Sequence, residues 1–229
     1  MNTVIVTGAS GNLGQAVIQK FLQEGYDVIG TVIPNDPVPL DIKHPAFESR
    51  IVDLGNESDA GKFIAEVINK KQSIGSAVLT VGGFAMGKMA DTSSADIQKQ
   101  VRLNFETAYH VARPVFLQMM KQGKGRIFLV GSKPGLDARN GKGMVAYGLA
   151  KSMVIRLAEI LNEEAKGTNV VTCVIVPSTI DTPQNRKSMP DADFNAWVKP
   201  EAIADIIYFY SSPASDPLRN PILKVFGNA

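Results

Sequence analysis

Short apolar runs alternate with helical patterns along the first part of the chain. Residues 3–7 (TVIVT) form a β-branched apolar run that ends at a glycine, which is typical of a buried strand. The apolar positions that follow repeat at helical spacing up to Gly25, and residues 26–33 (YDVIGTVI) predict a second strand. The chain therefore opens with a strand, a glycine-rich turn, a helix and a strand, which is the setting of a dinucleotide-binding motif.

The rest of the chain repeats this alternation, after a proline-rich connection that is too broken for a crossover helix. Residues 178–199 are expected to contain no regular element, and Pro114 is expected to kink a long helix. The pattern predicts one doubly wound α/β domain over residues 1–229, a Rossmann domain with seven parallel strands in the order 3-2-1-4-5-6-7 and helices on both faces. The further predicted strands are 50–54, 76–81, 126–132, 169–176 and 222–227; the helices are 56–71, 94–121, about 144–164 and 200–210; the loops are 84–91 and 133–143.

Composition and charge add few limits. The 229 residues are 45% hydrophobic and 20% charged, as in an ordinary globular protein, and the net charge is +2. This charge indicates neither a nucleic-acid nor a membrane partner. No apolar run reaches membrane-spanning length, and the first residues do not resemble a signal peptide. Cys173 is the single cysteine and suits a reducing compartment, and His44 and His110 stand alone, so we expect a cytoplasmic protein without a metal site.

Gly8, Gly11 and Gly14 lie between the first strand and the following helix. Glycines at this place permit a tight turn and let the backbone approach a pyrophosphate, while the helix start supplies N–H groups and a positive dipole end. The alternative is a tight turn without a ligand. The second strand ends without the acid that binds the ribose in NAD-specific sites, and Asp36, beyond Pro34, is interpreted as a turn residue, so NAD versus NADP stays open.

Tyr147 and Lys151 are four residues apart in a segment with a helical pattern. That spacing places two side chains on one face of a helix. A phenol has an unperturbed pKa of about 10, and a neighbouring ammonium favours the phenolate and lowers that pKa toward the working range. The pair is therefore a candidate proton donor. The alternative is that both are ordinary helix residues, with Tyr147 in the core and Lys151 solvated.

The chain also carries Asp53 after the third predicted strand, Gly82 with Gly83 after the fourth, Asn104 in the long helix, Ser132 after the fifth strand, and the stretch from Pro177 to Thr182 after the sixth. Together with the glycine turn and the pair of Tyr147 and Lys151, in this order, these positions resemble the short-chain dehydrogenase/reductase family over nearly the whole chain. The resemblance implies an NAD(P)H cofactor, a small-molecule substrate, a homodimer or homotetramer, and hydride transfer to a C=O or conjugated C=N group. A non-catalytic NAD(P)-binding sensor or scaffold is the alternative, since it would keep the glycine turn without the other residues.

The resemblance implies a role for each matching residue. Tyr147 would be the general acid, and Lys151 would lower its pKa and hold the nicotinamide ribose. Ser132 would bind the substrate oxygen or nitrogen, and Asn104 would hold a proton-relay water. Plainer roles are a turn for Ser132, a structural helix position for Asn104 and a helix start for Asp53. The implied cofactor-binding positions are Gly8, Ser10, Gly11, Asn12, Leu13, Gly14, Asp53, Leu54, Gly82, Gly83, Tyr147, Lys151, Pro177, Ile180 and Thr182.

Residues 180–197 closely resemble the corresponding loop of dihydropteridine reductases. This adds a quinonoid pterin ring to the candidate substrates, beside a small ketone, an aldehyde or a 3-oxoacyl thioester. Open α/β sheets bind ligands beyond the carboxyl ends of their strands, so residues 182–199 are expected to form a substrate lid. The alternative is a packed surface loop with solvated charges. The candidate contacts of the lid with substrate are Met189, Phe194, Trp197 and Arg186 or Lys187.

Overall fold

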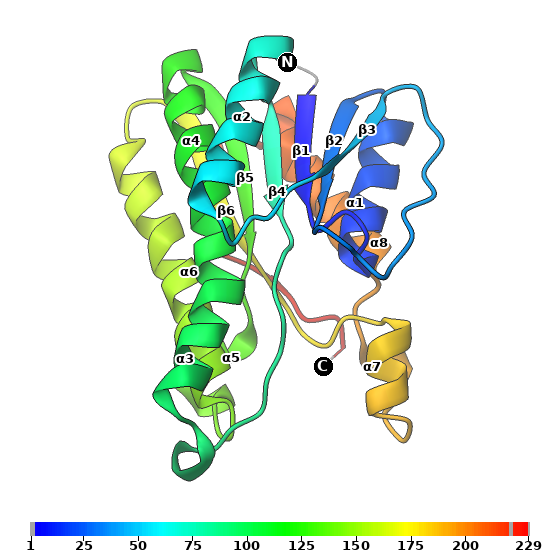
Figure 1. Ribbon diagram of the computed structural model, residues 1–229, viewed down its shortest axis with the longest axis vertical. Helices are drawn as coiled ribbons and strands as arrows, with labels where there is room; N and C mark the ends of the chain where they lie inside the picture. Colours follow the sequence, from blue (N-terminus) through cyan, green and yellow to red (C-terminus); the bar gives the residue numbers. More distant parts are fainter. Residues whose placement is uncertain (1–2, 220–221, 229) are drawn as a thin grey trace.

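The carboxyl ends of seven parallel strands meet along one edge of a single sheet (Figure 1). In this computed structural model the strand order is β3-β2-β1-β4-β5-β6-β7, which confirms the predicted order. The structure describes residues 3–219 and 222–228, so the predicted ends of the domain at residues 1 and 229 lie outside the described residues. The strands are β1 (Thr3–Thr7), β2 (Asp27–Val32), β3 (Phe47–Ile51), β4 (Ser76–Leu79), β5 (Lys124–Val130), β6 (Asn169–Pro177) and β7 (Ile222–Val225).

Helices cover both faces of the sheet, as expected for strands that read as continuous apolar runs. Figure 1 shows α1 and α8 on one face and α2, α4 and α6 on the other. Side chains of β1 point alternately to the two faces of the sheet. Ile5 packs under α2, α4 and α6, whereas Val4 and Val6 pack against α1 and α8. The helices are α1 (Asn12–Gln23), α2 (Glu57–Lys71), α3 (Ser94–Val101), α4 (Thr107–Gln122), α5 (Lys133–Leu136), α6 (Val145–Glu164), α7 (Pro183–Ser188) and α8 (Pro200–Ser211).

Among the described residues, two short α-helices occupy segments for which the sequence predicted no helix. The segment 178–199 contains α7, because the Thr182 side chain caps the first turn and Pro183 is compatible with a helix start. The expected loop 133–143 begins with α5, which is capped by the Ser132 side chain. Both helices are too short to show a periodic apolar pattern, so only their capping residues could have indicated them. None of the helices in the described part of the chain has the length and hydropathy needed to cross a membrane.

The predicted third strand and the predicted long helix also differ from the structure. β3 covers residues 47–51 rather than 50–54, since it pairs in register with β2, and Asp53 lies beyond its end. The long helix predicted over 94–121 is divided into α3 and α4 by a π-helical turn, Arg102–Glu106. Such turns inside helices are frequent at functional sites.

The strand order places a crevice at the centre of the sheet. β1 lies between β2 and β4. From β1 the strands β2 and β3 are added toward one edge of the sheet, and β4 to β7 are added toward the opposite edge. In open α/β sheets this topological switch point is where ligands bind, at the carboxyl ends of the strands. The loops after β1, β4, β5 and β6 therefore determine the site.

Candidate active site

A cleft of about 1720 Å³ opens at the carboxyl ends of β1, β4, β5 and β6. Pockets for drug-sized ligands have roughly 300–1,000 Å³, so this cleft has room for a dinucleotide and a substrate together. Asn104 is buried behind the wall of the cleft. The other residues predicted as catalytic or cofactor-binding all line it: Gly8, Ser10, Gly11, Asn12, Leu13, Gly14, Asp53, Leu54, Gly82, Gly83, Ser132, Tyr147, Lys151, Pro177, Ile180 and Thr182.

The glycine turn after β1 is built for a close approach of backbone to backbone. Gly8 has a left-handed φ of 66°, and a Cβ at Gly14 would lie 2.2 Å from the Gly8 carbonyl oxygen. α1 begins directly after Gly11, and among the described residues no side chain caps it and no acid occupies its first turn. N–H groups and the positive end of the helix dipole are therefore available at the cleft, which fits the pyrophosphate of a dinucleotide.

Gly11→Val and Gly14→Ala are expected to separate cofactor binding from folding. Gly11 is exposed and has a negative φ, so valine there fills the cleft and lowers dinucleotide affinity at least about tenfold, with a stability change within about 1 kcal/mol. Alanine at Gly14 overpacks the turn and costs at least about 1–3 kcal/mol. Fluorescence titration with NADH and NADPH and urea unfolding measure the two effects. Unchanged affinity in Gly11→Val would remove the turn from the cofactor site.

Tyr147 and Ser132 meet at one end of the cleft. Ser132 follows β5 and is buried, and its Oγ accepts a hydrogen bond from the Gly135 amide at 3.2 Å. Burial raises the pKa of the Tyr147 phenol, and a hydrogen bond with Ser132 opposes part of that rise. The phenol is therefore protonated at neutral pH and lies beside a second hydroxyl, which is the arrangement that a proton donor to a bound substrate needs.

Lys151 lies one helical turn beyond Tyr147, as its spacing predicted, but its ammonium is bonded elsewhere. The residue is 4% exposed, its Nζ donates to the Val130 carbonyl at 2.8 Å, and Nζ lies 6.0 Å from the centre of the Tyr147 ring. Burial lowers the pKa of Lys151 to about 8. The expectation that Lys151 lowers the pKa of Tyr147 below its ordinary value is wrong for this arrangement, because burial raises that pKa.

Asn104 lies in the π-helical turn, one layer behind the cleft. Its Oδ1 accepts from the Gly83 amide and its Nδ2 donates to the Gly83 carbonyl, both at 3.0 Å. Nδ2 also donates to Oε1 of Gln100 at 2.9 Å. The side chain thus holds the backbone at Gly83 in place, and its expected role with a relay water stays a prediction.

The sequence analysis interpreted Asp36 only as a turn residue and missed its contact with the glycine turn. The residue does form a turn, because its Oδ1 accepts from the Val38 amide at 2.9 Å. Its Oδ2 accepts from Ser10 Oγ at 2.5 Å, however, and the side chain lines the cleft beside the glycine turn. The hydrogen bond from Ser10, and then that from Val38, lowers the pKa of Asp36, so a carboxylate faces the cleft. This contact depends on the path of the proline-rich connection, which no periodicity predicts.

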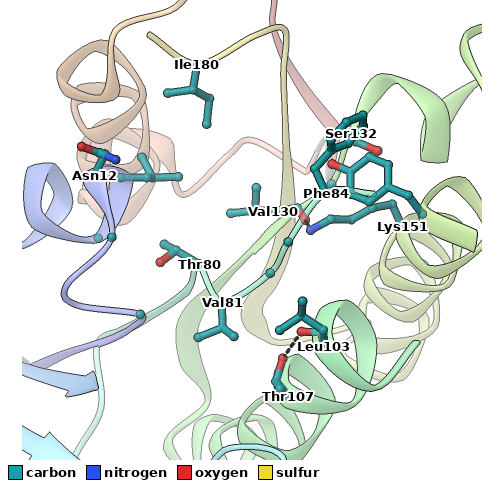
Figure 2. A pocket seen from close by; sticks show the side chains of 18 of the residues that line it. Asn12, Thr80, Val81, Phe84, Leu103, Thr107, Val130, Ser132, Lys151 and Ile180 are labelled. Atoms are coloured by element: carbon teal, nitrogen blue, oxygen red, sulfur yellow. Dashed lines mark hydrogen bonds between the residues drawn. The ribbon is translucent and has the colours of Figure 1, made fainter. Parts of the chain in front are cut away.

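Asp53 and Leu54 line the cleft in different ways. Asp53 forms a turn, in which its Oδ1 accepts from the Gly55 amide at 2.9 Å, and Asn56 rather than Asp53 caps α2. Leu54 is 6% exposed and belongs to the core under α2 and α4. Figure 2 shows further lining residues that the motifs did not single out, among them Thr80, Val81, Phe84 and Leu103. Among the described residues no group of three or more His, Cys, Asp or Glu could hold a metal ion.

The side chains of the expected lid, residues 182–199, contact one another and Asp181. Asp181 accepts two hydrogen bonds from Arg186, at 2.6 and 2.8 Å, and the Arg186 guanidinium lies 4.6 Å from the centre of the Phe194 ring. Phe194 in turn contacts Trp197, with ring centres 4.8 Å apart. Arg186 is therefore paired with Asp181, just before the lid, and the expected contact of Arg186 or Lys187 with the substrate stays a prediction. Met189 lines the cleft, whereas Phe194 and Trp197 are not among the residues that line it, and the expected contacts of the three with substrate stay predictions.

Comparisons with known proteins agree with this geometry. The chain matches the model of the family described as short chain dehydrogenase over residues 2–193. It is 24% identical over 235 residues to a 3-oxoacyl-acyl-carrier-protein reductase of Buchnera aphidicola, covering 98% of this chain and 96% of that protein. It is 27% identical over 226 residues to dihydropteridine reductase of Dictyostelium discoideum, covering 96% and 93%. A solved structure of a blue fluorescent protein from a metagenomic library, in complex with NADPH, shares the fold with a TM-score of 0.87 and 18% identity, covering 100% of this chain and 98% of that chain. The chain belongs to the short chain dehydrogenase family and is an NAD(P)-dependent oxidoreductase.

Proposed function

We propose that this oxidoreductase reduces a C=O or conjugated C=N group, with Tyr147 as the proton donor. The observation that carries the proposal is the meeting of Tyr147, Ser132 and Lys151 at one end of a cleft whose other end holds the glycine turn. Figure 2 shows Ser132 and Lys151 on one side of this cleft and Asn12 on the opposite side. A dinucleotide bound at the turn could thus reach the hydroxyl groups with its far end.

In the proposed reaction Ser132, Tyr147 and Lys151 each have a separate role. The nicotinamide cofactor, when bound, supplies the hydride. Ser132 Oγ holds the substrate oxygen or nitrogen by a hydrogen bond, and Tyr147 Oη donates the proton to that same atom. The Lys151 ammonium, buried one helical turn away, stabilises the negative charge that develops on the phenol as the proton leaves. The backbone at Gly83, held by Asn104, forms the wall next to this end of the cleft.

The substrate class that we propose is a small molecule with a conjugated ring. Support comes from apolar and polarisable side chains that line the cleft, among them Phe84, which contacts Tyr147, and Met144 and Met189. The similarity to dihydropteridine reductase points to the same class, whereas the similarity to the 3-oxoacyl reductase points to a thioester. Steady-state oxidation of NADH and NADPH against a panel of quinonoid pterins, quinones, ketones and a 3-oxoacyl thioester tests the proposal. Absence of cofactor oxidation with every member would contradict it.

The carboxylate of Asp36 favours NADH over NADPH in our proposal, because a negative charge beside the glycine turn repels a phosphate on the adenosine ribose. Asp36→Asn is therefore expected to increase the affinity for NADPH relative to NADH by at least about tenfold. Asp41→Asn, an exposed acid of the same connection, is the matched control. Fluorescence titrations with both cofactors measure the ratio, and an equal ratio in wild type and Asp36→Asn would exclude Asp36 from cofactor selection.

We further propose that copies of the chain associate through α6. Leu149, Met153 and Ile160 are 50%, 37% and 49% exposed, and their spacing of four and seven residues puts them on one face of the helix. An apolar stripe on an otherwise polar surface favours a helix–helix contact between subunits. This association would lie outside the cleft.

A further inference from the structure

Residues 83–87, here called the strap, leave the cleft wall after β4, and hydrogen bonds hold both ends of the segment. At one end Gly83 exchanges two hydrogen bonds with the side chain of Asn104, both at 3.0 Å. At the other end the Gly87 amide donates to the Gly143 carbonyl at 2.7 Å, and the Val145 amide donates to the Gly87 carbonyl at 3.1 Å. The second tie joins the strap to the first turn of α6, the helix that carries the catalytic phenol. The strap is therefore fixed relative to that helix.

Phe84 is the large side chain that the strap presents to the cleft. Its ring contacts the ring of Tyr147 edge to face, with centres 5.1 Å apart and planes at 78°. It nevertheless remains 62% exposed and lines the cleft. Figure 2 shows it beside Ser132, on the side of the cleft where the proton donor lies. Most of an aromatic surface is thus uncovered next to the reacting group, on a backbone that the ties hold in place.

We infer that Phe84 is a specificity-determining residue that stacks on the conjugated ring of the substrate. This inference rests on the proposed function and adds to it the surface that selects the substrate. A planar π-system gains stacking and burial against Phe84, whereas a saturated ring or an aliphatic carbonyl compound of similar size gains little. Burying the ring also removes apolar surface from water next to the phenol, which strengthens the electrostatic interactions there.

The residues after the strap supply a control for a general effect of exposed apolar side chains. Met89 lies two residues beyond the strap and is 77% exposed, but it is not among the residues that line the cleft. If exposed apolar side chains in this region acted only through stability or solubility, substitution of Met89 and Phe84 would have similar effects. If Phe84 acts on the substrate, only its substitution changes the selectivity.

The test compares wild type, Phe84→Leu, Phe84→Trp and Met89→Ala with two planar substrates and one saturated substrate. The probes are quinonoid 6,7-dimethyldihydropterin and 9,10-phenanthrenequinone on one side and cyclohexanone on the other. Phe84→Leu keeps an apolar side chain but removes the aromatic face, so kcat/KM for the planar probes is expected to fall at least about tenfold. The value for cyclohexanone and the affinity for NADH should change less than about twofold. Phe84→Trp should retain the planar activity, and Met89→Ala should match wild type.

Calorimetric titration of biopterin, a planar ligand, into the enzyme with bound NAD⁺ gives a second readout that needs no turnover. Weaker binding of biopterin to Phe84→Leu than to wild type supports the inference. An equal fall of kcat/KM for planar and saturated substrates in Phe84→Leu would mean that Phe84 only packs against Tyr147. Unchanged kcat/KM and unchanged binding of biopterin would mean that Phe84 does not contact the substrate. Either result overturns the inference. Failure of the proposed function looks different, because then wild type oxidises cofactor with no probe and Tyr147→Phe changes nothing.

Discussion

Tyr147→Phe is expected to lower kcat by at least the roughly 10²-fold that general acid catalysis contributes, while the protein stays folded. The substitution keeps the ring, its burial and its edge-to-face contact with Phe84, and removes only the hydroxyl that shares a hydrogen bond with Ser132. Cofactor affinity should change little, because the glycine turn lies at the other end of the cleft. Steady-state kinetics, fluorescence titration with NADH and thermal unfolding measure the three effects. Tyr109→Phe, in which a tyrosine stacked on Phe105 loses its hydroxyl, is the control.

The loss of activity in Tyr147→Phe should depend on the substrate. A ketone needs the proton as the hydride arrives, so it should show the full loss. A quinonoid dihydropterin gains driving force from its own aromatisation and should retain more turnover. Full activity of the variant on every substrate would exclude the acid role and return Tyr147 to helix packing.

The regular part of the fold was predictable from the sequence because its signals are local. The apolar run of residues 3–7 reads as a strand buried on both faces, and the structure buries all five residues. The glycines after it stand where a strand meets a helix, and the spacing of Tyr147 and Lys151 places both on one face of α6. Each of these predictions needs only neighbouring residues and the geometry of one element.

The parts of the site that could not be predicted depend on contacts between distant segments. Ser10 meets Asp36 across 26 residues, by way of a connection without periodicity. Phe84 contacts Tyr147 only because the strap is tied to the start of α6. The π-helical turn around Asn104 leaves no apolar pattern that differs from that of an ordinary helix. Local propensity contains no information on such pairings, so the fold has to be known first.

The pKa values of Tyr147 and Lys151 also depend on burial, which the spacing of the two residues in the sequence does not predict. A spacing of four residues predicts that Lys151 is near Tyr147, but it cannot say how far either side chain lies from water. The structure places Lys151 at 4% exposure, and burial then affects both groups in the direction of their neutral forms. The resulting pair is a phenol that keeps its proton at neutral pH and an ammonium that loses its proton near pH 8.

A pH dependence of the reduction follows from the pKa of Lys151. Burial lowers this pKa from 10.5 to about 8, so the ammonium is present below pH 8 and is lost as the pH rises through that value. Wild-type kcat/KM should therefore fall above about pH 8. Stability should move in the opposite direction, because between the folded pKa and the unfolded pKa the unfolded chain binds the proton more tightly. In that window the free energy of unfolding rises with pH.

Lys151→Met is expected to lower kcat/KM by about 10²-fold at pH 7 and to remove the decline above pH 8. Methionine has a similar length and no charge, so the variant lacks the stabilisation of the developing phenolate but avoids the cost of a buried ammonium. It should therefore unfold at the same temperature as wild type or higher, although the hydrogen bond to the Val130 carbonyl is lost. Lys121→Met, at an exposed lysine of α4, should keep both activity and pH profile. If Lys151→Met kept wild-type kcat/KM, or kept the decline above pH 8, the ammonium of Lys151 would have no part in the proton transfer.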